Sequence, residues 1–185
     1  MSLLRKTETR SKREFYKNSL AIFLKYYPNE GFDLKDMKLK WGADRETVRE
    51  LLKNNHTTND IVIDISSYTE NKSDTLVQKR DVYKNIGGEE NLFFLNYDIN
   101  DILKELEIHD GLELIIANIH FSFENEISEV VSHLKKISSN YKRLNTGEYL
   151  FEDLKIVIAD SETMGGEGDA LSYFYCAKNI DHLAE

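Results

Sequence analysis

The chain has 185 residues, of which 41% are hydrophobic and 31% charged, and its formal net charge is −9. These values are typical of a soluble globular protein with one domain or two small lobes that share a core. No apolar run approaches the ~20 residues of a membrane-spanning helix, which argues against a membrane partner. The single cysteine cannot form an internal disulfide, which favours a cytoplasmic location.

Charge is unevenly spread along the chain. Residues 1–53 contain 13 Lys or Arg and 8 Asp or Glu, whereas the remainder contains 11 and 25. Residues 1–53 are thus basic overall and the rest of the chain is acidic. The acidic part repels nucleic acid and favours a basic protein partner. The alternative is that the acidity serves solubility alone, since net charge says little about specific function.

Two helices are predicted in the first third of the chain. Apolar residues recur every three to five positions in residues 10–27 and predict an N-terminal helix that ends at Pro28. A second helix is predicted in GADRETVRELLKNN, with Asp44 as its N-cap and Glu46 in the first turn, where the helix dipole favours an acid. The stripe expected to be buried consists of Val48, Leu51 and Leu52.

Strands are expected to follow. Residues 61–68, 76–86 and 91–97 are rich in alternating or clustered apolar residues, a pattern typical of strands. The sequence GGEE at residues 87–90 is expected to connect the last two strands as a hairpin, because glycine suits tight turns.

The rest of the chain repeats this mixture of patterns. Residues 98–109 are predicted to form a short helix capped by Asp98, and residues 125–137 a longer one. LELIIANIHFSF is predicted to be a central strand, and YKRLNTGEYLF a hairpin. LKIVIAD and LSYFYCAKNI are predicted strands on either side of the second glycine pair.

Two stretches, NIGGEENLFFLNYD and TMGGEGDALSYFYC, resemble each other, and their glycine pairs are 78 positions apart. The helices before them align through Val48 and Val130, which are 82 positions apart. Such self-similarity is typical of a duplicated unit. We therefore predict an α+β fold of two related helix-plus-antiparallel-sheet (αβββ) units. The N-terminal helix and connection span 1–34, the first unit 35–110 and the second 111–185, packed as one compact domain.

The glycine pairs are interpreted as turns between strands. A phosphate-binding loop needs glycines that lead into a helix N-terminus, whereas both pairs lead into aromatic strands. Acids in the two loops would also repel phosphate. Because loops often carry binding residues, these acids are predicted to contact the partner. They are Glu89, Glu90, Glu167 and Asp169.

No motif indicates a specific chemistry. The five histidines lack zinc-binding spacings and no nucleotide or nucleophile motif is present, so we expect no metal, cofactor or catalytic residue. Cys176 is interpreted as a core residue of an aromatic strand. One alternative is an enzyme with an acid–histidine site around Asp160, Glu162 and His182. Another is a structural module that self-associates through an aromatic sheet face.

The segment KLKWGADRETVRELL resembles the helix opening of the small αβ domains in β-lactamase-inhibitor proteins and outer-membrane-assembly lipoproteins. The matching residues are Leu39, Gly42, Val48, Leu51 and Leu52. The resemblance implies an antiparallel sheet after the helix, in a unit that the inhibitor family duplicates. The lipoprotein cysteine, the export signal and the disulfide pair of those families have no counterpart in this sequence, so the resemblance does not imply an envelope role.

The overall character also resembles that of immunity proteins from bacterial toxin systems, which are small, acidic and cytosolic. That resemblance implies binding to a cognate toxin domain, often a basic one. We therefore expect a non-enzymatic protein-binding module of immunity or inhibitor type. Its acidic surface would steer and hold a basic partner.

Overall fold

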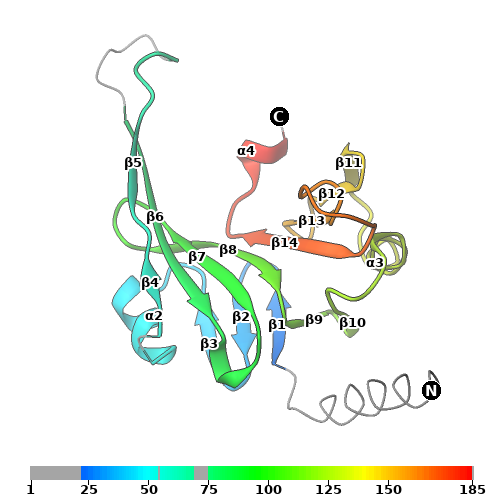
Figure 1. Ribbon diagram of the computed structural model, residues 1–185, viewed down its shortest axis with the longest axis horizontal. Helices are drawn as coiled ribbons and strands as arrows, with labels where there is room; N and C mark the ends of the chain where they lie inside the picture. The colour runs from blue at the N-terminus through cyan, green and yellow to red at the C-terminus, as the bar shows by residue number, and fades with distance from the viewer. Residues whose placement is uncertain (1–21, 54, 69–74, 185) are drawn as a thin grey trace, which may run out of the picture.

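The computed structural model of the chain describes residues 22–53, 55–68 and 75–184 (Figure 1). Two sheets, of five and nine strands, dominate these residues, and the three α-helices among them are short. The fold is therefore sheet-dominated, and the predicted α+β class with an N-terminal helix is wrong. Most of the helix predicted at 10–27 lies outside the described residues, while its last five residues form strand β1 (Phe23–Tyr27).

The five-stranded sheet joins the two halves of the chain. Its order is β10-β9-β1-β2-β3, with β1 antiparallel to β2 and parallel to β9. The single strand predicted in LELIIANIHFSF is a hairpin instead, because Ala117 and Asn118 both adopt positive φ and reverse the chain. The sequence patterns did not predict β2 or β3. The bounds are β2 (Gly31–Leu34), β3 (Met37–Lys40), β9 (Glu113–Ile116) and β10 (Ile119–Phe121).

The nine-stranded sheet consists of two meanders that meet antiparallel at β8 and β14. Helix α2 (Arg45–Leu51) precedes the first meander and α3 (Ile127–Leu134) the second. Strands β4 and β5 form one interrupted edge strand beside β6. The bounds are β4 (Thr57–Thr58), β5 (Ile61–Asp64), β6 (Thr75–Lys84), β7 (Leu92–Tyr97), β8 (Leu103–Asp110), β11 (Tyr141–Asn145), β12 (Glu148–Phe151), β13 (Ile156–Asp160) and β14 (Leu171–Ala177).

When β4 and β5 are counted as one strand, α2 and α3 are each followed by four strands of the large sheet. The predicted αβββ unit has only three. The five-stranded sheet also takes strands from both predicted units, since β1 pairs with β9. The division of the chain at residue 110 stays a prediction.

The two glycine pairs occupy different connections. Gly87 and Gly88 lie in a 3-10 turn, η1 (Ile86–Gly88), with φ of 72° and 84°. This turn joins antiparallel β6 and β7, so the predicted hairpin is confirmed. Gly165 and Gly166 lie between β13 and β14. In the first meander the glycine pair follows the second strand, when β4 and β5 are counted as one. In the second meander it follows the third strand, β13. The two glycine pairs are therefore not equivalent.

The helix predicted at 98–109 is wrong, because the chain forms a turn and then β8. Asp98 Oδ1 accepts hydrogen bonds from the backbone N–H of Asn100 and Ile102, and Asp101 has a φ of 62° that a helix does not allow. From Leu103 onward, β8 hydrogen-bonds to both β7 and β14. The backbone hydrogen bonds that this central strand makes to two neighbouring strands outweigh the helix preference indicated by the spacing of its apolar residues.

The helices and strands of the second half agree better with those predicted from the sequence. Helix α3 lies within the predicted 125–137, and β11 and β12 form the predicted hairpin at residues 145–147. Strands β13 and β14 were also predicted and are confirmed. Among the described helices, none is long and apolar enough to cross a membrane.

Helix α2 begins as predicted. The side chain of Asp44 accepts hydrogen bonds from the backbone N–H of Glu46 at 3.0 Å and of Thr47 at 3.3 Å. Val48 and Leu52 are buried, as expected, but Leu51 is 41% exposed. The predicted stripe is therefore wrong at Leu51, because the seven-residue helix packs through a narrower face.

We expect Asp44→Ala to lower the free energy of unfolding by about 1 kcal/mol, because two backbone donors lose their acceptor. Urea unfolding of the purified protein measures this loss. The control is Asp44→Asn, which keeps a capping oxygen and should lose a few tenths of a kcal/mol at most. Equal losses in both variants would show that the cap does not carry the effect.

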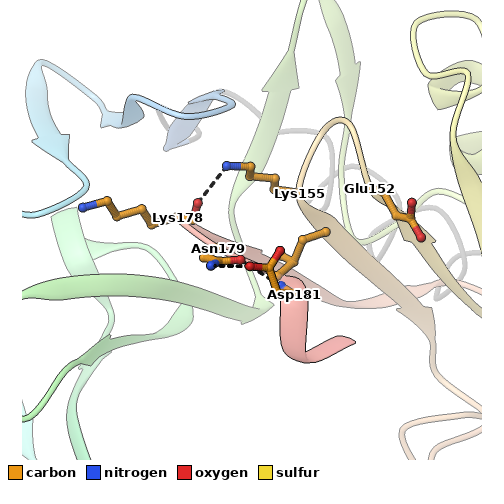
Figure 2. A pocket seen from close by; sticks show the side chains of 6 residues that line it. Glu152, Lys155, Lys178, Asn179 and Asp181 are labelled. Atoms are coloured by element: carbon orange, nitrogen blue, oxygen red, sulfur yellow. Dashed lines mark hydrogen bonds between the residues drawn. The ribbon is translucent and has the colours of Figure 1, made fainter. Parts of the chain in front are cut away.

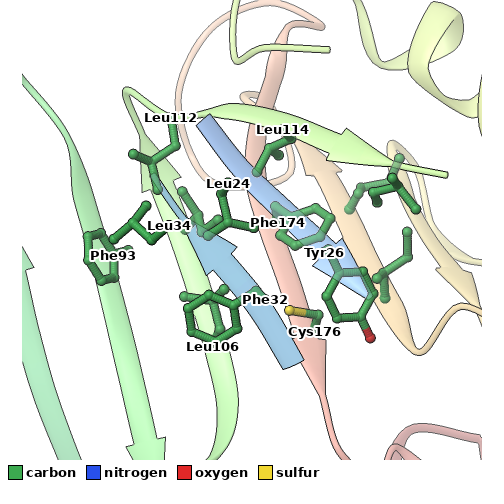
Figure 3. Packing of buried hydrophobic residues seen from close by; sticks show 14 of the residues in the cluster. Leu24, Tyr26, Phe32, Leu34, Phe93, Leu106, Leu112, Leu114, Phe174 and Cys176 are labelled. Carbon is green, nitrogen blue, oxygen red and sulfur yellow. The ribbon is translucent and has the colours of Figure 1, made fainter. Parts of the chain in front are cut away.

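The main hydrophobic core lies between the two sheets (Figure 3). The inward-facing side chains of β1 and β2 face those of β7, β8 and β14, and these core side chains are fully or almost fully buried. The labelled contacts include Leu24, Tyr26, Phe32 and Leu34 on one side and Phe93, Leu106, Phe174 and Cys176 on the other. Cys176 is a core residue, as predicted, and burial raises the pKa of its thiol well above the usual value. The thiol therefore stays protonated and unreactive in the folded protein.

Candidate functional site

The outer face, as we call it, is the face of the nine-stranded sheet that points away from the five-stranded sheet. Successive side chains of a strand point to opposite faces of the sheet, so each residue can be assigned to one of the two faces. On β7, Phe93 and Leu95 enter the core, whereas Phe94 and Asn96 belong to the outer face. The outer face comprises Arg80, Phe94, Asn96, Glu105, Glu107, His109 and Tyr173, from β6, β7, β8 and β14.

Polar side chains of the outer face form one hydrogen-bonded network. Arg80 Nε donates to Asn96 Oδ1 at 2.7 Å, and Arg80 Nη2 donates to Glu107 Oε1 at 2.6 Å. Asn96 Nδ2 donates to Glu105 Oε2 at 3.0 Å and also to Glu107 Oε1. The Arg80 and Glu107 side chains are 17% and 13% exposed, so solvent screens this ion pair less than a surface pair. The network holds side chains of three strands in one arrangement.

Aromatic contacts extend the same network across the sheet. The Arg80 guanidinium lies 4.8 Å from the centre of the Phe94 ring. The Phe94 ring lies 4.6 Å from His109, whose ring lies 5.2 Å from Tyr173. Because each ring contacts the next, the side chains have few alternative rotamers, and the surface is ordered before any partner arrives.

The charge states of the outer face follow from burial and from its internal contacts. Burial alone would raise the pKa of Glu107, but the neighbouring His109 and Asn96 side chains and the Arg80 charge outweigh it and hold the pKa below its usual value. Burial, reinforced by the charge of Glu107, raises the pKa of Tyr173. A fully paired, ionised carboxylate beside a neutral phenol provides neither a general acid with a matched pKa nor an activated nucleophile.

The C-terminal segment covers the adjoining part of this surface. A second apolar cluster lies there on β12, β13 and β14, formed by Leu150, Val157, Tyr175, Ala177 and Ile180. Helix α4 (Asp181–Ala184) follows Ile180 and stands over β14 in Figure 1. Leu183 of this helix packs against the cluster. The open part of the surface is therefore the stretch over β6, β7 and β8, with the Tyr173 position of β14.

The four predicted partner-contacting acids lie at one end of the nine-stranded sheet. Glu89 and Glu90 follow η1, before β7, and Glu167 and Asp169 precede β14. Because β8 is antiparallel to both β7 and β14, the starts of those two strands lie at the same end of the sheet. Glu89 is half-buried and the other three are exposed. No side-chain hydrogen bond or ion pair joins the two pairs within the described residues.

The residues of the alternative acid–histidine site are not brought together. Asp160 pairs with Leu171 at the start of β14, whereas His182 lies in α4, beyond the end of β14. In the part of the chain that the structure describes, no hydrogen bond or ion pair joins Asp160, Glu162 and His182. Asp160 Oδ1 accepts a hydrogen bond from Thr163 N at 2.8 Å, which gives this buried carboxylate a role in shaping the loop. Glu162 is exposed.

The histidines are also dispersed. His109 lies on the outer face, whereas His120 lies on the small sheet, where its Nε2 is 2.9 Å from Glu113 Oε2 and its ring contacts Phe23. The described part of the chain contains no group of three or more His, Cys, Asp or Glu that could hold a metal ion.

A surface cavity of about 530 Å³ lies beside the C-terminal segment (Figure 2). Its polar groups bind one another: Lys155 Nζ donates to the Lys178 carbonyl at 2.8 Å, and Asn179 Nδ2 donates to Asp181 Oδ2 at 2.8 Å. Figure 2 shows Glu152 pointing away from these groups. The cavity therefore lacks a set of polar groups that converge on one ligand.

A second cluster of charges is buried and holds α2 to the sheet. Asp81, which is fully buried, accepts from Arg45 Nη2 at 2.6 Å and from Arg49 Nη2 at 2.8 Å. Arg45 also donates to Asp60 at 2.7 Å and to Asp101 at 3.0 Å. Every carboxylate in this cluster is paired and the Arg45 side chain is 5% exposed, so the cluster is structural.

The predicted site contained the loop acids but none of the polar residues of the outer face. A signal for them exists in KELEIHD, where Glu105, Glu107 and His109 alternate with apolar residues as in a half-buried strand. The apolar residues of 98–109 also have a helical spacing, which predicts a helix in place of the strand. Comparison of the chain with models of protein families, with characterised proteins and with solved structures gave no match.

Proposed function

We propose that this protein is a non-enzymatic, cytoplasmic binding protein of inhibitor or immunity type, whose outer face contacts a protein partner. The observation that carries the proposal is the outer face itself. It is a rigid sheet surface on which aromatic and charged side chains are ordered by mutual contacts. A free, buried cysteine is compatible with a reducing compartment.

Composition and order both favour a protein partner. Tyrosine, phenylalanine and arginine are enriched in the centres of protein interfaces, and the outer face combines all three. Side chains that are already immobile lose little conformational entropy on binding. The paired Arg80 and Glu107 present hydrogen-bonding atoms without leaving an isolated charge to desolvate.

The loop acids keep a part in this proposal as a negatively charged rim. Glu89, Glu90, Glu167 and Asp169 lie beyond the strand ends, where they attract a basic protein before contact. Such charges raise the association rate more than they lower the dissociation rate. Nucleic acid is repelled by the same charges.

The test begins with capture of partners from the host lysate at low and moderate salt and their identification by mass spectrometry. The purified partner is then titrated against variants of the full chain. We expect Tyr173→Ala to weaken binding about 10-fold or more, because it removes an aromatic side chain of the outer face. The control is Tyr141→Ala, which truncates a tyrosine that is 44% exposed on the distant edge strand β11 and should bind as the wild type does.

The rim gives a separate kinetic signature. Reversal of all four loop acids to lysine should slow association and reduce its dependence on salt, with little change in dissociation. If Tyr173→Ala binds normally while the reversed rim abolishes binding, the partner contacts the loops and not the outer face. Wild-type binding by both sets of variants would contradict the proposal.

A further inference from the structure

Strand β5 forms part of a two-stranded arm that extends from the body of the protein (Figure 1). All four residues of β5 are exposed. Ile61, Val62 and Ile63 are 43%, 67% and 41% exposed, and Leu76 on the adjoining part of β6 is 52% exposed. A ribbon of only two strands is marginally stable in water, and aliphatic residues exposed on both of its faces are a further cost.

Among the described strands, β5 pairs with β6 alone, so the backbone groups on its outer edge have no partner strand there. The backbone N–H of Asn59 donates to the Arg80 carbonyl, and the register places Ile61 opposite Gln78 and Ile63 opposite Leu76. Hydrogen-bonded positions alternate along an antiparallel ladder, so the odd-numbered residues bond to β6. The N–H and C=O groups of Asp60, Val62 and Asp64 therefore point away from the sheet.

The other sheet edges in the described part of the chain carry features that oppose strand addition. Strand β3 presents exposed lysines at 38 and 40, and β10 is three residues long. Strand β11 carries Lys142 and Arg143 and has a register irregularity between Arg143 and Asn145. Cations, short strands and bulges are the usual protection of an edge. Strand β5 is also short, at four residues, but it has no cation and no register shift against β6, and it presents three consecutive aliphatic residues.

We propose that β5 pairs antiparallel with β5 of a second copy of this chain, which joins the two arms into one four-stranded sheet. Two identical antiparallel strands are related by a two-fold axis, so the contact is complete at the dimer and does not continue into a fibre. With the axis at Val62, the outward groups of residues 60, 62 and 64 bond to those of 64, 62 and 60 of the second copy. Ile61 then lies opposite Ile63 of the second copy at a closely spaced, non-hydrogen-bonded position.

The same pairing predicts a weak dimer that salt strengthens. It buries a few hundred Å² of apolar surface per copy, less than the ~800 Å² per partner of a standard stable interface. It also brings together two chains that each have a net charge of −9. Salt screens this repulsion. We expect a dissociation constant on the order of 10 µM that falls as ionic strength rises.

Sedimentation equilibrium of the full chain between about 1 and 300 µM tests the proposal. The decisive variant is Val62→Pro, which removes an outward N–H and leaves the bonds from β5 to β6 in place, as proline is tolerated on an edge in this orientation. It should remain monomeric throughout the range. The matched control is Leu144→Lys, at a residue 42% exposed on the opposite edge strand, which should dimerise as the wild type does. Circular dichroism confirms that both variants are folded.

Each result decides the question. A wild-type dimer that Val62→Pro abolishes, Leu144→Lys preserves and salt strengthens supports the pairing of two β5 strands. A wild type that is monomeric at 300 µM overturns the proposal. A Val62→Pro protein that still dimerises, or a wild-type dimer that salt dissociates, also overturns it, because the contact is then elsewhere or ionic.

Discussion

Asp81→Ala is expected to lower the free energy of unfolding by about 3–5 kcal/mol, because it leaves two arginines without their shared, buried acceptor. Asp81 is fully buried and accepts hydrogen bonds from both Nε and Nη2 of Arg45 and of Arg49. A loss of this size is a large part of the ~5–15 kcal/mol that stabilises a typical domain. Urea unfolding monitored by circular dichroism measures it.

The matched control is Asp60→Ala, which removes a different carboxylate from the same arginine. The Asp60 side chain is 39% exposed, so water can solvate Arg45 Nη2 in its place. Its loss should be about 1 kcal/mol. If the two variants are equally stable, Asp81 does not act as a buried counter-ion and the assignment of a structural role to the cluster is wrong.

The same residue sets a pH dependence. Burial alone would raise the pKa of Asp81, but hydrogen bonds from Arg49 and Arg45 outweigh it and hold the pKa below its usual value. A depressed pKa in the folded state contributes stability above the unfolded pKa of about 4, and this stability is lost as pH falls through the folded value. Wild-type stability should therefore drop below about pH 4, and Asp81→Ala should show a smaller drop.

Phe174→Ala is expected to cost about 3–5 kcal/mol, the usual range for a fully buried aromatic residue. Phe174 is inaccessible to solvent and pairs with Ile158 on β13 and Ile108 on β8. Its ring centre lies 6.2 Å from that of Tyr26 and 6.5 Å from that of Phe121, so it joins the large sheet to the small one. A cavity there removes contacts from both sheets at once.

Thermal and urea unfolding together measure this effect. The control is Phe23→Ala, since Phe23 is a phenylalanine that is 43% exposed on β1 and should cost less than about 1 kcal/mol. Phe174→Leu should fall between the two, because the leucine fills part of the space. A loss below 1 kcal/mol in Phe174→Ala would mean that the two sheets are not held together at this position.

The elements that the sequence predicted correctly are those whose signals are local. Asp44 caps α2 through N–H groups two and three residues away, and Gly87 turns the chain between two strands that are neighbours in sequence. Cap and turn chemistry depend on the backbone of a few adjacent residues, so they can be identified without knowledge of the fold. The core position of Cys176 followed from the apolar residues next to it.

The elements that the sequence did not determine depend on distant partners. Residues 23–27 and 103–110 have helical spacing of apolar residues, yet both are strands, because β1 pairs with β9 and β8 pairs with β14. Strand pairing supplies backbone hydrogen bonds that a local pattern cannot reveal, and register then decides which side chains share a face.

The candidate site follows the same division. The acids of the two loops were evident from the sequence, but Arg80, Asn96 and Glu107 meet only because three strands lie side by side in one register. Composition and local chemistry thus determined the turns, caps and acidic character of this protein. The tertiary structure alone decided the dominance of sheet and the arrangement of the outer face, because both arise from hydrogen bonds between residues far apart in the chain.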